Sequence, residues 1–237
     1  MSMQILESLL ADLKKLKNPQ KAKVLARFFK TGKGEYGEGD VFWGIIVPKQ
    51  RIVARRYIEK ISFADLRYLL KQKVHELRFL AVVILVLKYQ RGELGEKMRV
   101  ADFYLQNLNR INNWDLVDLS APQILGDYLF EKDRTILYRL ASSRNLWERR
   151  ISIISTLGFI RNRDFYDTLK IAKILLLDRH DLIHKAVGWM LREIGKREKK
   201  EEVNFLHKYA KKMPRTALRY AIEKFSKEER EIYLKMC

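Results

Sequence analysis

The sequence predicts an all-α protein and, within that class, an α-solenoid built from helix pairs. Apolar residues recur with the period of about 3.6 residues that is typical of helices, whereas the alternating pattern of strands is scarce. Marker positions in successive amphipathic segments also lie 37, 35, 35 and 34 residues apart: Arg78, Asp115, Arg150, Lys185 and Arg219. Two helices and their turns fit that length. Stacked helix pairs form a solenoid in which one helix of each pair lines a concave surface.

The apolar periodicity places the helices in order along the chain, at about residues 3–16, 20–30, 48–59, 62–71, 75–89, 96–108, 114–130, 132–141, 145–160, 164–177, 181–196, 200–211, 215–224 and 226–235. Short breaks at residues 18–19, 90–92, 161–163 and 213–214 separate some of them. No linker or low-complexity tract divides the chain, so a single domain over residues 1–237 is expected. The alternative is an irregular bundle, because any all-helical protein spaces its helix pairs by roughly 30 to 45 residues.

The composition indicates a basic protein with ample material for a core. Hydrophobic residues make up 47% of the 237, and 48 Lys and Arg against 29 Asp and Glu leave a formal charge of +19. A polyanion, first of all nucleic acid, is the expected partner. Cys237 is the only cysteine, which excludes an intrachain disulfide and suits a reducing compartment. Residues 1–7 resemble an amphipathic helix, and the apolar run 79–87 is too short to span a bilayer, so a cytoplasmic protein without a membrane segment is expected.

Trp114 and Asp118 form the most informative pair in the chain. Residues four apart share one face of a helix, and a basic protein has little structural reason to bury an acid. Pro122 has no N–H group to donate to the carbonyl of residue 118, so the helix should kink or restart there. Alternatively, Ser120 is the N-cap of a helix that begins near Pro122. The competing interpretation is that Asp118 caps a helix or pairs with an arginine.

The marker positions single out the same segment. In three other segments a cation, Arg78, Arg150 or Lys185, is followed three residues later by a small or apolar residue. In this segment Asp115 and Asp118 occupy the equivalent positions. Local departures from a pattern that holds in the rest of the chain are expected at functional sites, although neutral drift also produces them.

Adjacent arginines begin the segment at residues 146–150. Arg149 and Arg150 must point in different directions, and the planar guanidinium suits phosphate because it donates two hydrogen bonds at once. The alternative is a helix surface on which an arginine pairs with Glu148 or Asp133.

A further tryptophan, Trp189, adjoins a glycine inside a strong helix pattern. Glycine there costs about 1 kcal/mol relative to alanine, so close packing or ligand approach is expected to require Gly188. A tryptophan on a helix face is more often a core residue than a binding residue. The remaining tryptophans, Trp43 and Trp147, are interpreted as packing residues.

Apparent motifs elsewhere do not support a site. Residues 32–37 spell GxGxxG, but no strand precedes them and the acidic residues 38–40 would repel phosphate, so a flexible loop is expected. His180 and His184 share a helical turn but lack the glutamate of a zincin helix and a third ligand, so no metal site is expected. The dispersed basic residues could together neutralise several phosphates.

The motifs, taken in order, resemble those of the AlkD-type alkylpurine DNA glycosylases, the DNA alkylation repair family built from HEAT-like helical repeats. The resemblance extends from about residue 20 to 225 and rests on residues 42–45 with Pro48 and Arg51, and on residues 114–118, 146–150 and 188–193. It implies a concave, basic DNA-binding groove. It also implies hydrolysis of the N-glycosidic bond of cationic N3- or N7-alkylpurines in duplex DNA, as in base excision repair, by a monofunctional glycosylase.

The resemblance assigns roles to individual residues. Asp118 matches the catalytic aspartate, Trp114 and Trp189 the aromatic residues flanking the lesion, and Arg150 the arginine at the DNA backbone, with Arg149 the second candidate for that role. The chemistry agrees, because a cationic purine leaves without a general acid. One carboxylate can then stabilise the oxocarbenium-like sugar and orient water, while tryptophan faces favour a cation. A monomer without metal or cofactor is expected.

Other functions remain compatible with the sequence. A non-catalytic DNA-binding HEAT-repeat scaffold for unusual DNA structures would bind in a salt-dependent way without Asp118. A protein-interaction solenoid would bind no nucleic acid, and its charge would serve solubility.

Overall fold

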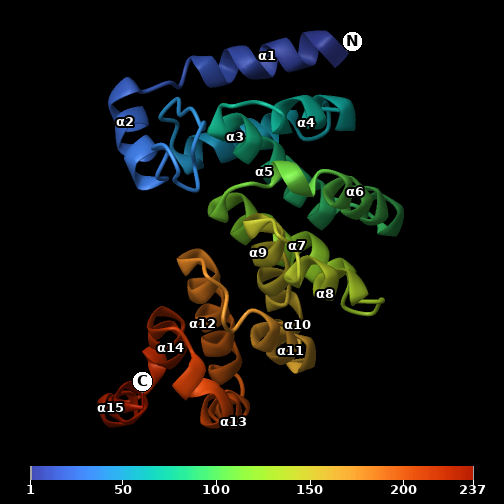
Figure 1. Ribbon diagram of the computed structural model, residues 1–237. Helices are drawn as coiled ribbons and strands as arrows, with labels where there is room; N and C mark the ends of the chain where they lie inside the picture. The colour runs from blue at the N-terminus through green and yellow to red at the C-terminus, as the bar shows by residue number, and fades with distance from the viewer. Residues whose placement is uncertain (1, 237) are drawn as a thin grey trace. The chain divides into compact units, whose positions relative to one another are not determined.

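The computed structural model describes the backbone of residues 2–236 and the side chains of residues 4–236. Regular structure in this range is helical, apart from an isolated bridge between Val41 and Val74 (Figure 1). The all-α prediction is therefore confirmed. Cys237, on which the expectation about disulfides rests, lies outside the described residues.

The described chain divides into two compact units that meet in sequence between Ser120 and Ala121. The first contains α1 (Ser2–Lys14), α2 (Pro19–Phe28), α3 (Val47–Tyr57), α4 (Phe63–Leu70), α5 (His75–Arg91), α6 (Leu94–Gln106), the 3₁₀ turn η1 (Leu108–Arg110) and the first turns of α7 (Trp114–Tyr128). The second contains the rest of α7, α8 (Thr135–Ala141), α9 (Leu146–Ser155), α10 (Leu157–Arg161), α11 (Tyr166–Ile174), α12 (Asp181–Gly195), α13 (Lys199–Tyr209), η2 (Ala210–Lys212), α14 (Arg215–Ala221), η3 (Ile222–Lys224) and α15 (Lys227–Lys235). A single domain over residues 1–237 stays a prediction.

Helix α5 is the core helix of the first unit. It packs against α3, α4 and α6, and its residues from His75 to Val86 are all buried. A helix that is apolar nearly all round is stable only when neighbours cover it on every side. This explains the apolar run at residues 79–87. Within residues 2–236, no helix has both the length and the apolar character that crossing a membrane requires.

The second unit is made of stacked helix pairs. Helix α12 packs against α9, α13 and α14, while α11 contacts α8 and α9. The pair α11 and α12 therefore packs on the preceding pair α8 and α9, and α13 and α14 pack on α12. Successive packing of helix pairs is the arrangement of an α-solenoid, so the predicted fold class is confirmed. The contact between α12 and α14 requires Gly188, because a Cβ atom there would lie 2.3 Å from the carbonyl oxygen of Ala217. The prediction of close packing at Gly188 is also confirmed.

Some details of the predicted helices are wrong. The helix expected at residues 145–160 ends at Ser155, and α10 begins at Leu157. The hydroxyl of Thr156 donates to the carbonyl of Ile153 at 2.7 Å, and this local bond competes with the helical pattern.

The reading of Ser120 as a helix cap is wrong as well, because α7 runs from Trp114 to Tyr128 with Pro122 inside it. Ser120 is fully buried, and its hydroxyl donates to the carbonyl of Leu116 at 2.6 Å. The helix therefore does not restart at the proline, although Pro122 has no amide hydrogen to give to the carbonyl four residues earlier.

Candidate functional site

Trp114, the first residue of α7, is held against the end of α2. Its ring stacks on Phe29 with centroids 5.2 Å apart and planes 12° apart, and Phe28 meets it edge-on at 5.8 Å. Phe29 in turn stacks on Phe42 at 5.0 Å. Aromatic pairs at these distances add attraction beyond the area they bury. The orientation of the half-buried Trp114 ring is thus determined by the aromatic residues of α2 and its C-terminal cap.

The turn before α7 is anchored by Asn113, which is fully buried. Its side-chain oxygen accepts from the backbone N–H of Trp114 at 2.8 Å, and its amide group donates to Asp40 at 3.2 Å. The side chain of Asn113 therefore connects the start of the helix to the end of the acidic segment at residues 32–40.

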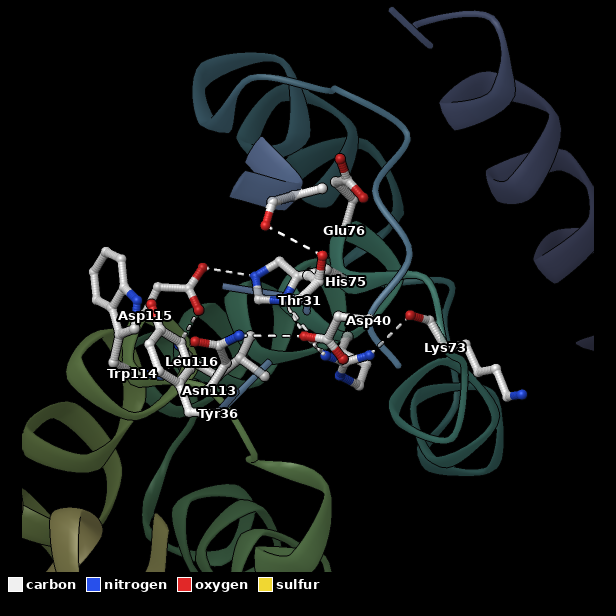
Figure 2. Close-up of polar contacts among 12 residues, drawn as sticks. Thr31, Tyr36, Asp40, Lys73, His75, Glu76, Asn113, Trp114, Asp115 and Leu116 are labelled. Atoms are coloured by element: carbon white, nitrogen blue, oxygen red, sulfur yellow. Dashed lines mark hydrogen bonds and ion pairs between the residues drawn. The ribbon is translucent and has the colours of Figure 1, made fainter. Parts of the chain in front are cut away.

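His75 lies between two carboxylates (Figure 2). Its Nε2 is 2.8 Å from Oδ2 of Asp115, and its Nδ1 is 3.3 Å from Oδ2 of Asp40. Burial by itself would lower the pKa of His75. The negative charge of Asp115 and the hydrogen bonds to both carboxylates outweigh burial and raise this pKa.

Asp40 also binds a buried arginine. Nη2 of Arg78 lies 2.7 Å from Oδ2 of Asp40, and Nη1 donates to the carbonyls of Gln72 and Lys73 at 3.0 and 3.2 Å. Burial would raise the pKa of Asp40, but its hydrogen bond with His75 and the positive charge of Arg78 lower it instead. We call Asp40, His75, Arg78, Asn113 and Asp115 the His75 network. It attaches the start of α7 to α5 through charged hydrogen bonds.

Asp118 lies one turn after Trp114 on α7 and is half-buried. Its surroundings include Tyr104, whose hydroxyl lies 2.8 Å from that of Ser120. Burial raises the pKa of Tyr104, and the negative charge of Asp118 acts in the same direction. The predicted helical relationship of Trp114 and Asp118 is confirmed. The catalytic role of Asp118 stays a prediction.

The predicted arginines belong to the second unit, where both are bound by protein acceptors. Arg150 is only 5% exposed and donates to the carbonyl of Leu182 at the start of α12. Nε of Arg149 donates to Asp178 at 2.6 Å, and its Nη1 donates to the carbonyls of Ser143 and Arg144 at 3.0 Å. The anionic partner of Arg149 is thus Asp178 rather than Glu148 or Asp133. A phosphate contact by either arginine stays a prediction.

Trp189 is half-buried on α12, directly after Gly188. Its Nε1 donates to Glu193 at 3.3 Å. Arg150 reaches the first turn of this same helix, so the arginine and the tryptophan are connected through α12. Trp114 and Asp118 lie in the first unit and the other predicted site residues in the second. That all of them face one groove stays a prediction.

The remaining tryptophans and histidines have structural contacts. Trp147 is buried, and Trp43 donates its backbone N–H to Glu76 while Lys17 lies 4.0 Å from its ring centre. The ring of His180 accepts from the backbone N–H of Leu182 at the start of α12, and His184 binds the carbonyl of Asp178. Among the described residues, no cluster of three or more possible metal ligands was found.

The sequence pattern identifies Arg78 and Asp115 as marker positions and Asp40 as part of an acidic segment, but it predicts neither a role for His75 nor the pairing of these residues. His75 lies three residues before the marker Arg78, on the same side of α5, and this spacing was the available signal. The binding of Asp40 was not predictable locally, because it lies 73 residues from Asn113 along the chain.

Together these features define a class of protein: an all-helical repeat protein whose seventh helix presents a tryptophan and an aspartate one turn apart. The family model described as DNA alkylation repair enzyme matches residues 9–225. The chain therefore belongs to the DNA alkylation repair enzyme family.

Comparison with solved structures agrees on the fold. A protein of Enterococcus faecalis, described as a predicted DNA alkylation repair enzyme, matches with a TM-score of 0.68 and 19% identity. The match covers 89% of this chain and 97% of that one. A search of curated proteins found no significant match.

Proposed function

We propose that the protein is a monofunctional DNA glycosylase that hydrolyses the N-glycosidic bond of cationic N3- or N7-alkylpurines in duplex DNA. Asp118 is the catalytic carboxylate in this proposal. Trp114 and Trp189 contact the damaged nucleotide, and Arg149 or Arg150 contacts the DNA backbone. Membership of the DNA alkylation repair family supports DNA as the substrate, and the formal charge of +19 supports binding to a polyanion.

The proposed reaction requires few protein side chains because its substrate is already positively charged. An N3- or N7-alkylated purine is already positively charged, so its bond to the sugar breaks without protonation by the enzyme. The carboxylate of Asp118 stabilises the positive charge that develops on the sugar and orients the attacking water. The ring of Trp114 favours a cationic base over a neutral one by about 0.5–2 kcal/mol, which selects for damage. No metal or cofactor takes part in these steps.

The observation that carries the proposal is the way in which the start of α7 is held. Asn113 and Asp115, on either side of Trp114, bind Asp40 and His75 of the His75 network. The Trp114 ring is stacked on Phe29 as well. A catalytic carboxylate one turn away benefits from such support, because small displacements of a reacting group reduce the rate strongly.

The decisive experiment is base release from a defined lesion. A duplex with a single N7-methylguanine is incubated with the protein, and abasic sites are converted to strand breaks with alkali. We expect breaks with the wild type and a loss of at least about 100-fold with Asp118→Asn. Asp127→Asn, an exposed aspartate on the same helix, is the matched control and should retain activity.

The same samples test the alternative of a non-catalytic DNA-binding scaffold. Binding of undamaged duplex is measured at several salt concentrations, and both hypotheses expect affinity to fall as salt rises. If the wild type binds but releases no more base than Asp118→Asn, the scaffold is the correct function. We further propose that the chain acts as a monomer, as a single domain, in the cytoplasm.

A further inference from the structure

Helices α11 and α13 of the second unit border an open groove of about 500 Å³. Many of its lining residues are three or four positions apart on each helix, such as Lys170 and Lys173 on α11 and Glu201, Phe205 and Lys208 on α13. This spacing places the side chains of each helix on one face. The groove contains none of the residues proposed above for base excision, so it is a second surface with chemistry of its own.

Three lysines give the groove its positive charge. Lys173 and Lys208 are exposed, and neither forms an ion pair with any residue that the structure describes. The third, Lys170, donates to the hydroxyl of Tyr166, and the one acid among the described lining residues is Glu201. Other lysines of this unit are bound by acids, as in the pairs of Lys185 with Asp181, Lys196 with Glu193 and Lys199 with Glu229. Lys173 and Lys208 therefore remain available to an anion, and phosphate is the first candidate.

Tyrosine rings lie beside these lysines in the wall of the groove. Tyr166, at the start of α11, is 62% exposed even though Nζ of Lys170 lies 4.1 Å from its ring centre. Tyr209 is half-buried and packs on the buried ring of Phe205, with centroids 4.7 Å apart. Accessible aromatic rings next to unpaired cations are the combination that binds single-stranded nucleic acid, because bases stack on the rings while the cations bind phosphates.

The exposed tyrosine favours a single strand over the other polyanions. In a duplex the faces of the bases are stacked on their neighbours, whereas an unpaired base has a free face for an aromatic side chain. An acidic peptide would use the lysines but would leave the ring of Tyr166 without a partner. The exposed side chain of Asn204 also lines the groove and supplies a donor and an acceptor for the edge of a base. Membership of the DNA alkylation repair family makes DNA the expected nucleic acid.

We propose that the groove between α11 and α13 binds a short segment of single-stranded DNA, with a base stacked on Tyr166 and the flanking phosphates at Lys170, Lys173 and Lys208. The contact goes beyond the proposed base excision and does not involve Asp118. It lets the protein hold an unpaired strand at a surface that is separate from the excision residues.

A matched pair of strands tests the stacking. One is a labelled oligodeoxythymidylate of about eight nucleotides, and the other is a strand of the same length in which every nucleotide is abasic. The two carry the same number of phosphates. Fluorescence anisotropy of the full chain should show that the strand with bases binds about tenfold more tightly than the abasic strand. Equal affinity for the two strands overturns the proposal, since charge alone then accounts for the binding.

Tyrosine variants locate the stacked base. Tyr166→Ser should bring the two affinities to within about twofold of each other, because the ring that distinguishes the strands is removed. Tyr68→Ser alters a tyrosine of α4 that is 47% exposed and lies outside the groove. It is the matched control and should keep the preference of the wild type. A preference that survives in Tyr166→Ser, with a native melting curve, overturns the assignment, because the bases then stack on another surface.

Charge reversals test the phosphate contacts. Lys173→Glu combined with Lys208→Glu should weaken binding of both strands by at least about tenfold. Lys227→Glu combined with Lys235→Glu gives the same change in formal charge at exposed lysines of α15 outside the groove, and should weaken binding by no more than about threefold. Equal losses in the two double variants overturn the proposal. It is also overturned if an oligoglutamate peptide of equal charge displaces the strand as effectively as unlabelled oligodeoxythymidylate does.

Base release separates this proposal from the proposed glycosylase activity. The N7-methylguanine duplex is incubated in parallel with the wild type and with Tyr166→Ser, which should release base at equal rates. A slower rate in Tyr166→Ser contradicts the separation of the two surfaces. If no protein releases base while the strand preference is intact, only the proposed function fails. If base is released but the strands bind equally, only the groove proposal fails.

Discussion

Nε2 of His75 lies 2.8 Å from Oδ2 of Asp115, and this contact joins the start of α5 to the first turn of α7. Asp115 lies between Trp114 and Asp118 in the sequence. The backbone that carries the proposed site residues of the first unit is therefore attached to the core helix of that unit. In the marker pattern Asp115 is the exception, and in the structure it is the residue that makes this attachment.

The contribution of His75 to stability should depend on pH. Its pKa is raised in the folded protein, so its stabilising contribution is complete below the unfolded-state pKa of about 6.5 and is lost as the pH rises through the folded-state pKa. The difference in unfolding free energy between the wild type and His75→Leu should therefore be largest near pH 6 and shrink toward alkaline pH. Denaturant titrations across this range measure it. A difference that grows with pH contradicts the assignment.

Asp115→Asn should lower the pKa of His75. Burial already acts to lower that pKa, and the charge of Asp115 is the largest of the influences that raise it. The asparagine keeps a hydrogen-bonding group but removes the charge. An NMR titration of the His75 ring protons gives the pKa directly. Asp127→Asn, an exposed position on the same helix, serves as the control, and an unchanged His75 pKa in Asp115→Asn shows that the charge has no such effect.

Asp40→Asn should destabilise the fold by roughly 3–5 kcal/mol, because it leaves a buried guanidinium without its carboxylate. The guanidinium belongs to Arg78, whose side chain is 3% exposed, and its Nη2 lies 2.7 Å from Asp40. Urea unfolding of both proteins measures the change. Glu38→Gln alters an exposed carboxylate of the same segment and should cost no more than about 1 kcal/mol. Similar losses of unfolding free energy in the two variants would show that the ion pair between Asp40 and Arg78 does not stabilise the fold.

Gly188→Ala should lower the free energy of unfolding by roughly 1–3 kcal/mol, although alanine favours helices. The new Cβ atom would lie 2.3 Å from the carbonyl oxygen of Ala217, so α12 and α14 must move apart. Gly95→Ala in α6 is the control, because nothing lies within 4 Å of its Cβ position. That variant should be as stable as the wild type or up to about 1 kcal/mol more stable. Equal behaviour of the two glycines would show that α12 and α14 tolerate the added methyl group.

Local periodicity was sufficient to predict most helices, the helix-pair repeat and the placement of Trp114 and Asp118 on one helix. These features depend on residues a few positions apart, whose spacing is visible in the chain. The two places where the helix prediction was wrong also have local causes. Thr156 interrupts the helix expected at residues 145–160 through its hydroxyl. Ser120, one of the alternatives for a helix cap, instead donates to a carbonyl inside α7. In both cases a short polar side chain offers the backbone an alternative hydrogen bond.

The sequence by itself determined the fold class, the family motifs and the basic charge. Only the tertiary structure decided which charges are paired: Asp40 with Arg78, His75 with Asp115, and Arg149 with Asp178. It also decided that the side-chain oxygen of Gln50 is buried without a hydrogen-bond partner among the described residues. The physical reason is that hydrogen-bond partners and desolvation depend on residues that lie far apart in the chain, whereas helix formation depends on residues within a few turns.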